Sequence, residues 1–61
     1  MKENIKLKYK KGDWVYYQDH LNKIEDIHHF EHGTFYVLKP HNSIITEVLP
    51  YKHGDKYFRK A

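Results

Sequence analysis

Lys11-Gly12-Asp13-Trp14-Val15-Tyr16-Tyr17 is the stretch that decides the fold of this chain, because a turn in it leads directly into a strand. Glycine adopts positive φ at little cost, and aspartate hydrogen-bonds to the backbone of its own turn, so we expect the chain to reverse here. Tryptophan, valine and tyrosine fit a pleated, half-buried surface, which predicts an extended strand after the turn. The stretch therefore indicates a β fold and says little about chemistry.

Further short strands are predicted along the rest of the chain, separated by turns rich in Gly, Pro and Asn. The first predicted strand covers 13–18, the second starts at Lys23, and others are expected over 34–39, 43–48 and 56–59. A period-2 pattern over residues 5–9 predicts an edge strand or a frayed terminus, and residues 49–51 predict a tight or 3₁₀ turn. Four or five short antiparallel strands joined in this way predict an all-β fold, a small barrel or sandwich. Closure into a barrel is favoured because it removes exposed strand edges.

The second strand contains two apolar anchors, Ile24 and Ile27, that lie three residues apart. Strict alternation would place them on opposite faces of a sheet, so a β-bulge is needed to bring them to one face. One turn of helix would also bring them together. The surrounding β-branched residues and the downstream Gly33 favour the bulge.

Alternation along the strands separates candidate core residues from exposed ones. If Val15 points inward, then Trp14 and Tyr16 point outward and Tyr17 lies on the core side. By the same rule, an inward Val37 places Tyr36 outward. The candidate core consists of the aliphatic and aromatic strand residues Val15, Ile24, Ile27, Phe35, Val37, Leu38, Ile44, Ile45, Val48 and Leu49.

The size of the chain predicts a single small domain over residues 1–61, with a barrel core at about 8–52 and flexible or edge-pairing termini. There is no cysteine, so neither a disulfide nor a thiolate metal site can form. No apolar run is long enough to span a membrane, and residues 1–5 lack the apolar segment of a secretory signal. We therefore expect a soluble, cytoplasmic protein without a membrane partner.

The formal net charge is +3, and lysines gather toward the two ends of the chain. A basic surface attracts anionic partners, although charged termini also keep a small protein soluble. A single arginine in the sequence argues against base-specific recognition, which relies on arginine.

Catalysis is not expected. The sequence contains no nucleophile elbow, phosphate-binding glycine loop or Cys-His pair, and it implies no cofactor. Six histidines are present, of which His28 and His32 would share a face of a helix and could bind Zn²⁺ there. No third ligand is evident, so metal binding is only an alternative to exposed histidines near a turn.

The run Gly12-Asp13-x-Val15, the pair Ile24-x-x-Ile27, Tyr36-Val37 and the run Ile45-Thr46-Glu47-Val48-Leu49 resemble the SH3-like barrel modules of bacterial and phage proteins, including KOW-type and Tudor-like relatives. The resemblance covers about residues 8–52 and concerns the fold. It implies a module that binds proteins, RNA, DNA or modified peptides. The chain departs from KOW modules because it lacks their characteristic turn glycine and their basic cluster between the first two strands.

The aromatic residues carry the functional prediction. Outward rings of this kind dominate protein-binding surfaces, so we expect a non-enzymatic module that contacts a protein partner, such as a phage or mobile-element protein acting on a host factor. The predicted binding surface comprises Trp14, Tyr16, Tyr36, Lys8, Lys10 and Lys11. Nucleic-acid binding through the basic N-terminal strand and these rings is the alternative. The rings could instead serve packing beneath the terminal segments, and the edge-like strand over 5–9 could pair with a second copy.

Overall fold

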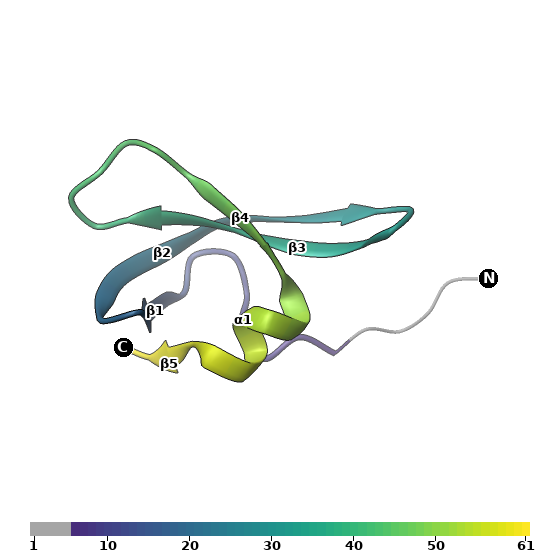
Figure 1. Ribbon diagram of the computed structural model, residues 1–61, viewed down its shortest axis with the longest axis horizontal. Helices are drawn as coiled ribbons and strands as arrows, with labels where there is room; N and C mark the ends of the chain where they lie inside the picture. Colours follow the sequence, from purple (N-terminus) through teal and green to yellow (C-terminus); the bar gives the residue numbers. More distant parts are fainter. Residues whose placement is uncertain (1–5) are drawn as a thin grey trace.

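The computed structural model describes residues 6–61, and its main element is a five-stranded antiparallel sheet in the order β4-β3-β2-β1-β5 (Figure 1). The elements are β1 (Trp14–Tyr17), β2 (His20–Phe30), β3 (Gly33–Pro40), β4 (Glu47–Pro50), α1 (Tyr51–Tyr57) and β5 (Arg59–Lys60). The predicted all-β class is confirmed. The outer strands β4 and β5 do not pair with each other, so the sheet stays open and does not close into a barrel.

The turn before β1 forms as the sequence predicts. Gly12 has a φ of 96°, a value that favours glycine, and its N–H donates to the Ile24 carbonyl across 2.8 Å. Asp13 Oδ2 accepts a hydrogen bond from the Lys10 N–H at 3.1 Å, and the Asp13 carbonyl accepts one from the Ile24 N–H at 2.8 Å. The turn therefore anchors the start of β1 to the middle of β2.

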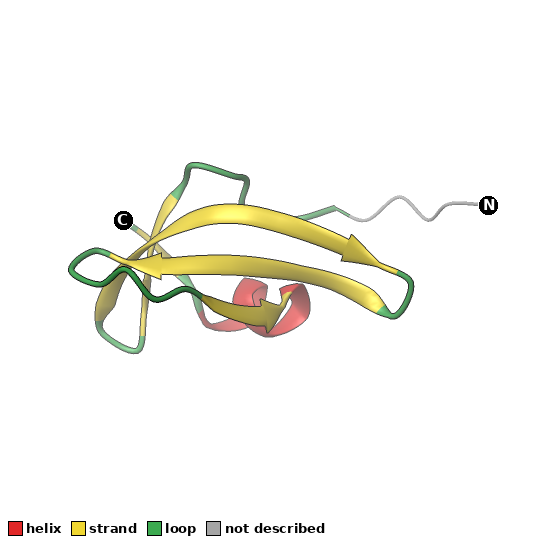
Figure 2. Cartoon of the chain, turned by 90° about the horizontal axis from the view of Figure 1, so that it is seen from above, coloured by secondary structure: helices red, strands yellow, loops and turns green. Residues whose placement is uncertain are grey.

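The predicted bulge in β2 is also confirmed. The register of β2 against β3 shifts between Ile24, which faces Leu38, and Asp26, which faces Val37. The extra residue brings Ile24 and Ile27 to the same face, where Ile24 is fully buried and Ile27 packs against the core. The long β2–β3 hairpin projects from the bulge, as Figure 2 shows from above.

The core lies on the concave face of the sheet, the face on which α1 packs (Figure 1). Its buried residues come from the first four strands and from the residue between α1 and β5: Val15, Ile24, Tyr36, Leu38, Leu49 and Phe58. Leu7, Tyr9, Tyr17 and Tyr51 are partly buried against them. The packing thus continues to Phe58, beyond the expected core range.

Two assignments on β3 are wrong, and they share one cause. Tyr36 is fully buried, whereas the sequence analysis places it outward. Val37 is buried as well, but on the opposite, convex face, because the side chains of neighbouring strand residues alternate. Alternation holds along β3, but Tyr36 and not Val37 is the residue that points toward the core.

Three other predicted core residues are exposed: Ile44 at 90%, Ile45 at 74% and Val48 at 53%. The expected strand over 43–48 begins only at Glu47, so Ile44 and Ile45 lie in the loop before β4. Val48 belongs to β4 but faces Val37 across the convex face.

The chain after β4 and before β1 also departs from expectation. Residues 51–57 form α1, where a tight or 3₁₀ turn at 49–51 was expected, and the last strand shortens to two residues. Residues 6–9 form no strand, so the edge strand predicted over 5–9 is wrong for these four, while Ile5 lies outside the described residues. Leu7 and Tyr9 serve the core instead of a sheet edge.

Candidate binding surfaces

The convex face of the sheet carries most of the exposed aromatic side chains. Trp14 and Tyr16 are 42% and 41% exposed, which confirms that both point away from the core. The Trp14 ring meets His41 edge-on, with the ring centroids 6.3 Å apart. Both rings are therefore available to a ligand.

Cross-strand pairing places cations beside these rings. Trp14 lies opposite Lys23 of β2, and Lys23 in turn lies opposite Lys39 of β3. Tyr16 lies opposite Arg59 of β5. Directly opposite residues share a face of the sheet, so we call Trp14, Tyr16, Lys23, Lys39 and Arg59 the cationic-aromatic surface.

The three lysines of the predicted binding surface have other contacts. Lys8 Nζ donates to the Asp55 carbonyl of α1 at 3.2 Å. Lys10 Nζ lies 3.7 Å from Asp13 Oδ1, and Lys11 Nζ lies 3.9 Å from Asp26 Oδ1. The structure therefore pairs them with nearby acceptors and does not join them to Tyr16. Sequence reasoning missed Lys23, Lys39 and Arg59 because only the strand register brings them to Trp14 and Tyr16.

Tyr36 belongs to the interior and not to a binding surface. Its hydroxyl donates to Asp55 Oδ1 at 2.6 Å and accepts from the Tyr9 N–H at 3.4 Å. Burial and the hydrogen bond to Asp55 raise the pKa of the Tyr36 hydroxyl well above its usual range. Its role is structural.

A second group of exposed side chains lies toward the hairpin end of the convex face. Phe30 is 51% exposed and contacts Phe35, with ring centroids 5.7 Å apart. Phe35 lies opposite Pro50, and Val37 lies opposite Val48. We call Phe30, Phe35, Val37, Val48 and Pro50 the apolar hairpin surface.

His28 and His32 lie on either side of Phe30 and do not form a ligand pair. The His32 ring stacks on Phe30 at an interplanar angle of 6°, and His28 meets Phe30 edge-on, each at 5.6 Å between centroids. His28 Nε2 also lies 3.4 Å from Asp26 Oδ2. Within residues 6–61, no group of three or more His, Cys, Asp or Glu side chains is placed to hold a metal ion.

Asp26 is the carboxylate beside His28. Its side chain accepts a hydrogen bond from the Ile27 N–H at 2.9 Å. This bond is the main reason why the pKa of the Asp26 carboxyl lies below its usual range, and the nearby Lys11 ammonium lowers it further. Asp26 therefore caps a backbone donor at the free edge of β2.

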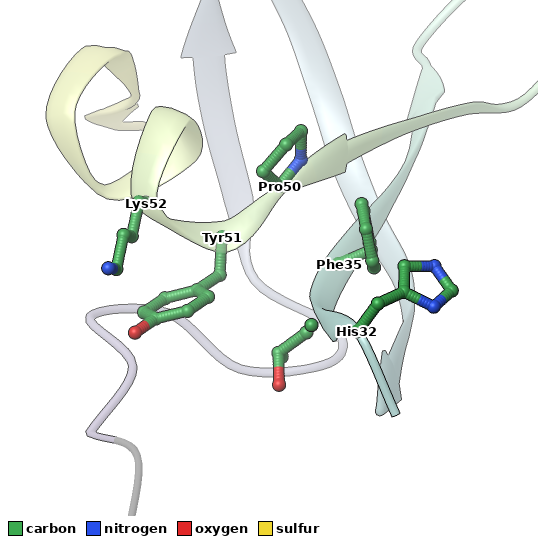
Figure 3. Close-up of a pocket in the computed structure, with 7 residues that line it drawn as sticks. His32, Phe35, Pro50, Tyr51 and Lys52 are labelled. Carbon is green, nitrogen blue, oxygen red and sulfur yellow. The ribbon is translucent and has the colours of Figure 1, made fainter. Parts of the chain in front are cut away.

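A groove of about 360 Å³ adjoins the apolar hairpin surface (Figure 3). In the view of Figure 3, His32 and Phe35 lie on one side of the groove, and Tyr51 and Lys52 lie on the other. Pro50 lies between these two pairs of residues. The groove thus combines apolar rings with two groups that carry or can acquire positive charge.

A smaller groove of about 290 Å³ lies between the β1–β2 turn and α1, lined by Tyr17, Gln18, His53 and Tyr57. The Tyr17 hydroxyl lies 2.8 Å from His53 Nε2. Among the residues that the structure describes, no carboxylate lines either groove.

No protein-family model, curated protein or solved structure matches this chain. In the part of the chain that the structure describes, α1 is too short and too polar to cross a membrane.

Proposed function

We propose that this protein is a non-enzymatic binding module that contacts a protein partner through the apolar hairpin surface. The observation that carries the proposal is the exposure of Phe30 and Val48, 51% and 53%, next to Phe35 and Pro50 on one face of the sheet. Apolar side chains gathered on an exposed face mark interaction sites, whereas singly scattered ones need no explanation. Here strand pairing makes them neighbours.

The adjacent groove supports the same proposal. It begins at Phe35 and Pro50, which also belong to the apolar hairpin surface, and it ends at Tyr51 and Lys52 of α1. A side chain from the partner can enter this groove while neighbouring residues of the partner contact the apolar hairpin surface. Aromatic anchors with a polar rim are typical of the centres of protein interfaces.

Each groove contains one histidine, His53 or His32, but among residues 6–61 no carboxylate lines either groove to orient that histidine, which favours binding over general acid–base catalysis. We also propose that the chain is an open form of the SH3-like barrel. Four strands run in succession, and after α1 the fifth strand returns to pair with β1.

An affinity-capture experiment with variants tests the interaction. The immobilised protein is incubated with nuclease-treated lysate, and the captured proteins are compared with those held by the double variant Phe30→Ser/Val48→Ser. We expect the wild type to retain a specific protein at near-stoichiometric amounts and the double variant to lose it.

Tyr57→Ser is the matched control, since Tyr57 is 52% exposed but lies on α1, away from the convex face. It should retain the captured protein. Thermal unfolding of each variant checks that the fold is intact. Identical captured proteins for the wild type and the double variant would rule out the apolar hairpin surface as the interface.

A further inference from the structure

We infer that the cationic-aromatic surface binds single-stranded nucleic acid. This surface lies on β1, β5 and the adjoining ends of β2 and β3, away from the hairpin tip, and the inference does not rest on the proposed protein interface. Three observations support it: the alignment of the cations with the rings, the absence of neutralising carboxylates, and the exposure of the two rings.

The alignment follows from strand pairing. Trp14, Lys23 and Lys39 form one row across three adjacent strands. Neighbouring strands lie about 4.8 Å apart, so this row spans only about 10 Å. Arg59 stands opposite Tyr16 and extends the surface onto a fourth strand. Each exposed ring therefore has a cation directly opposite it on the neighbouring strand.

Within residues 6–61, no ion pair neutralises the cations of this surface. Like charges that lie directly opposite each other on a sheet destabilise it, and Lys23 and Lys39 lie in this arrangement. Among residues 6–61, no carboxylate lies within 4 Å of Lys23, Lys39 or Arg59. Glu25, the nearest acidic residue along β2, forms no ion pair with them. A polyanion relieves this repulsion, so the surface is complementary to phosphates.

The rings favour a single strand over a duplex or an acidic protein. Trp14 and Tyr16 are two residues apart on β1, on the same side, so they stand about 7 Å from each other. Bases of a single strand stack on such rings, and the flanking lysines contact the phosphates between them. The bases of a duplex are already stacked on each other. The carboxylates of an acidic protein would pair with the cations of this surface but would not stack on its aromatic rings.

The chemistry of the cations predicts little sequence preference. Lysine acts as a point charge toward phosphate, while base-specific contacts rely mostly on the planar fork of arginine. Arg59 is the only arginine in the chain. Preference among oligonucleotides should therefore follow stacking strength.

The test uses the full-length protein and the fluorescence of Trp14, its only tryptophan. Twelve-nucleotide oligo(dT) and oligo(U) are titrated at low salt, and the affinity is then measured at rising salt. We expect Trp14 fluorescence to be quenched on binding and the affinity to fall steeply with salt. Trp14→Leu, followed by anisotropy of a labelled oligonucleotide, should bind about tenfold or more weakly.

Two double variants with equal net charge locate the surface. Lys23→Gln/Lys39→Gln should weaken binding and reduce the slope of log affinity against log salt by about 1.4, since each phosphate contact to a single strand contributes about 0.7. Lys52→Gln/Lys56→Gln, on α1, should leave binding nearly unchanged. Phe30→Ser/Val48→Ser should also bind the oligonucleotide normally, which separates this inference from the proposed protein interface.

Several results would overturn the inference. The first is that the oligonucleotides do not quench Trp14 fluorescence at low salt. The second is that the two double lysine variants lose equal amounts of oligonucleotide affinity. The third is that the protein binds polyglutamate as tightly as it binds the oligonucleotides. Tighter binding to a duplex than to the single strand would also contradict it. Thermal unfolding of each variant excludes loss of the fold as the cause of weaker binding.

Discussion

The Tyr36 hydroxyl donates a hydrogen bond to Asp55 Oδ1 across 2.6 Å and so ties β3 to α1. The same hydroxyl accepts a hydrogen bond from the Tyr9 N–H at 3.4 Å. One buried side chain therefore connects the sheet, the helix and the segment before β1. The helix that completes the core depends on this connection.

Tyr36→Phe should lower the free energy of unfolding by about 1–2 kcal/mol, because it leaves the Asp55 carboxylate and the Tyr9 N–H without their partner. Urea unfolding followed by circular dichroism measures the change. Tyr57→Phe is the control, since the Tyr57 hydroxyl makes no hydrogen bond to another described side chain, and it should change stability by a few tenths of a kcal/mol at most. Equal effects in the two variants would contradict this role of Tyr36.

The raised pKa of Tyr36 also predicts a dependence of stability on pH. The hydroxyl holds its proton more tightly in the folded chain than in the unfolded one, where its pKa is about 10. The contribution of Tyr36 is therefore fully present below about pH 10 and is lost as the pH rises further. Urea midpoints at pH 8 and pH 11 should differ more for the wild type than for Tyr36→Phe. An equal fall of the urea midpoint in both proteins would show that Tyr36 does not cause the pH dependence of stability.

Gly54→Ala should destabilise the protein by about 1–3 kcal/mol, although alanine is a better helix former than glycine. A Cβ at Gly54 would lie 2.7 Å from ring carbons of both Phe58 and Tyr36, and both rings are buried in the core. Lys56→Ala, on the exposed side of the same helix, serves as the control and should be nearly neutral. A more stable Gly54→Ala variant would show that the core can move apart at this point.

The environment of Trp14 predicts its response to ionic quenchers. The indole is 42% exposed and lies opposite Lys23, so iodide should quench its fluorescence more efficiently than caesium does. Stern–Volmer plots at constant ionic strength measure the two efficiencies. Lys23→Gln/Lys39→Gln should bring the two closer together. A larger effect of caesium on the wild type would contradict a cationic environment.

Helix α1 shows how tertiary packing can override local preference. Its sequence, Tyr-Lys-His-Gly-Asp-Lys-Tyr, places a glycine at the centre and has no acidic residue in its first turn, so helix propensity does not predict it. The helix forms because Gly54 allows Phe58 and Tyr36 to pack closely against it. The sequence instead predicts a tight or 3₁₀ turn at 49–51 and a strand over 56–59.

Local features of the chain were determined by the sequence alone. The turn at Gly12, the outward direction of Trp14 and Tyr16, and the bulge between Ile24 and Ile27 all depend on neighbouring residues and on the period of two along a strand. These rules act within a few residues, so they could be applied without knowing the rest of the fold.

Only the tertiary structure decided which face of β3 is covered and which side chains meet across strands. Alternation separates Tyr36 from Val37, but it does not show that α1 would pack on the side of Tyr36. Likewise, Lys23 and Lys39 become neighbours of Trp14 through a register that depends on turn lengths and on the bulge. Packing and register are set between distant segments, and for that reason the candidate surfaces emerged only from the folded chain.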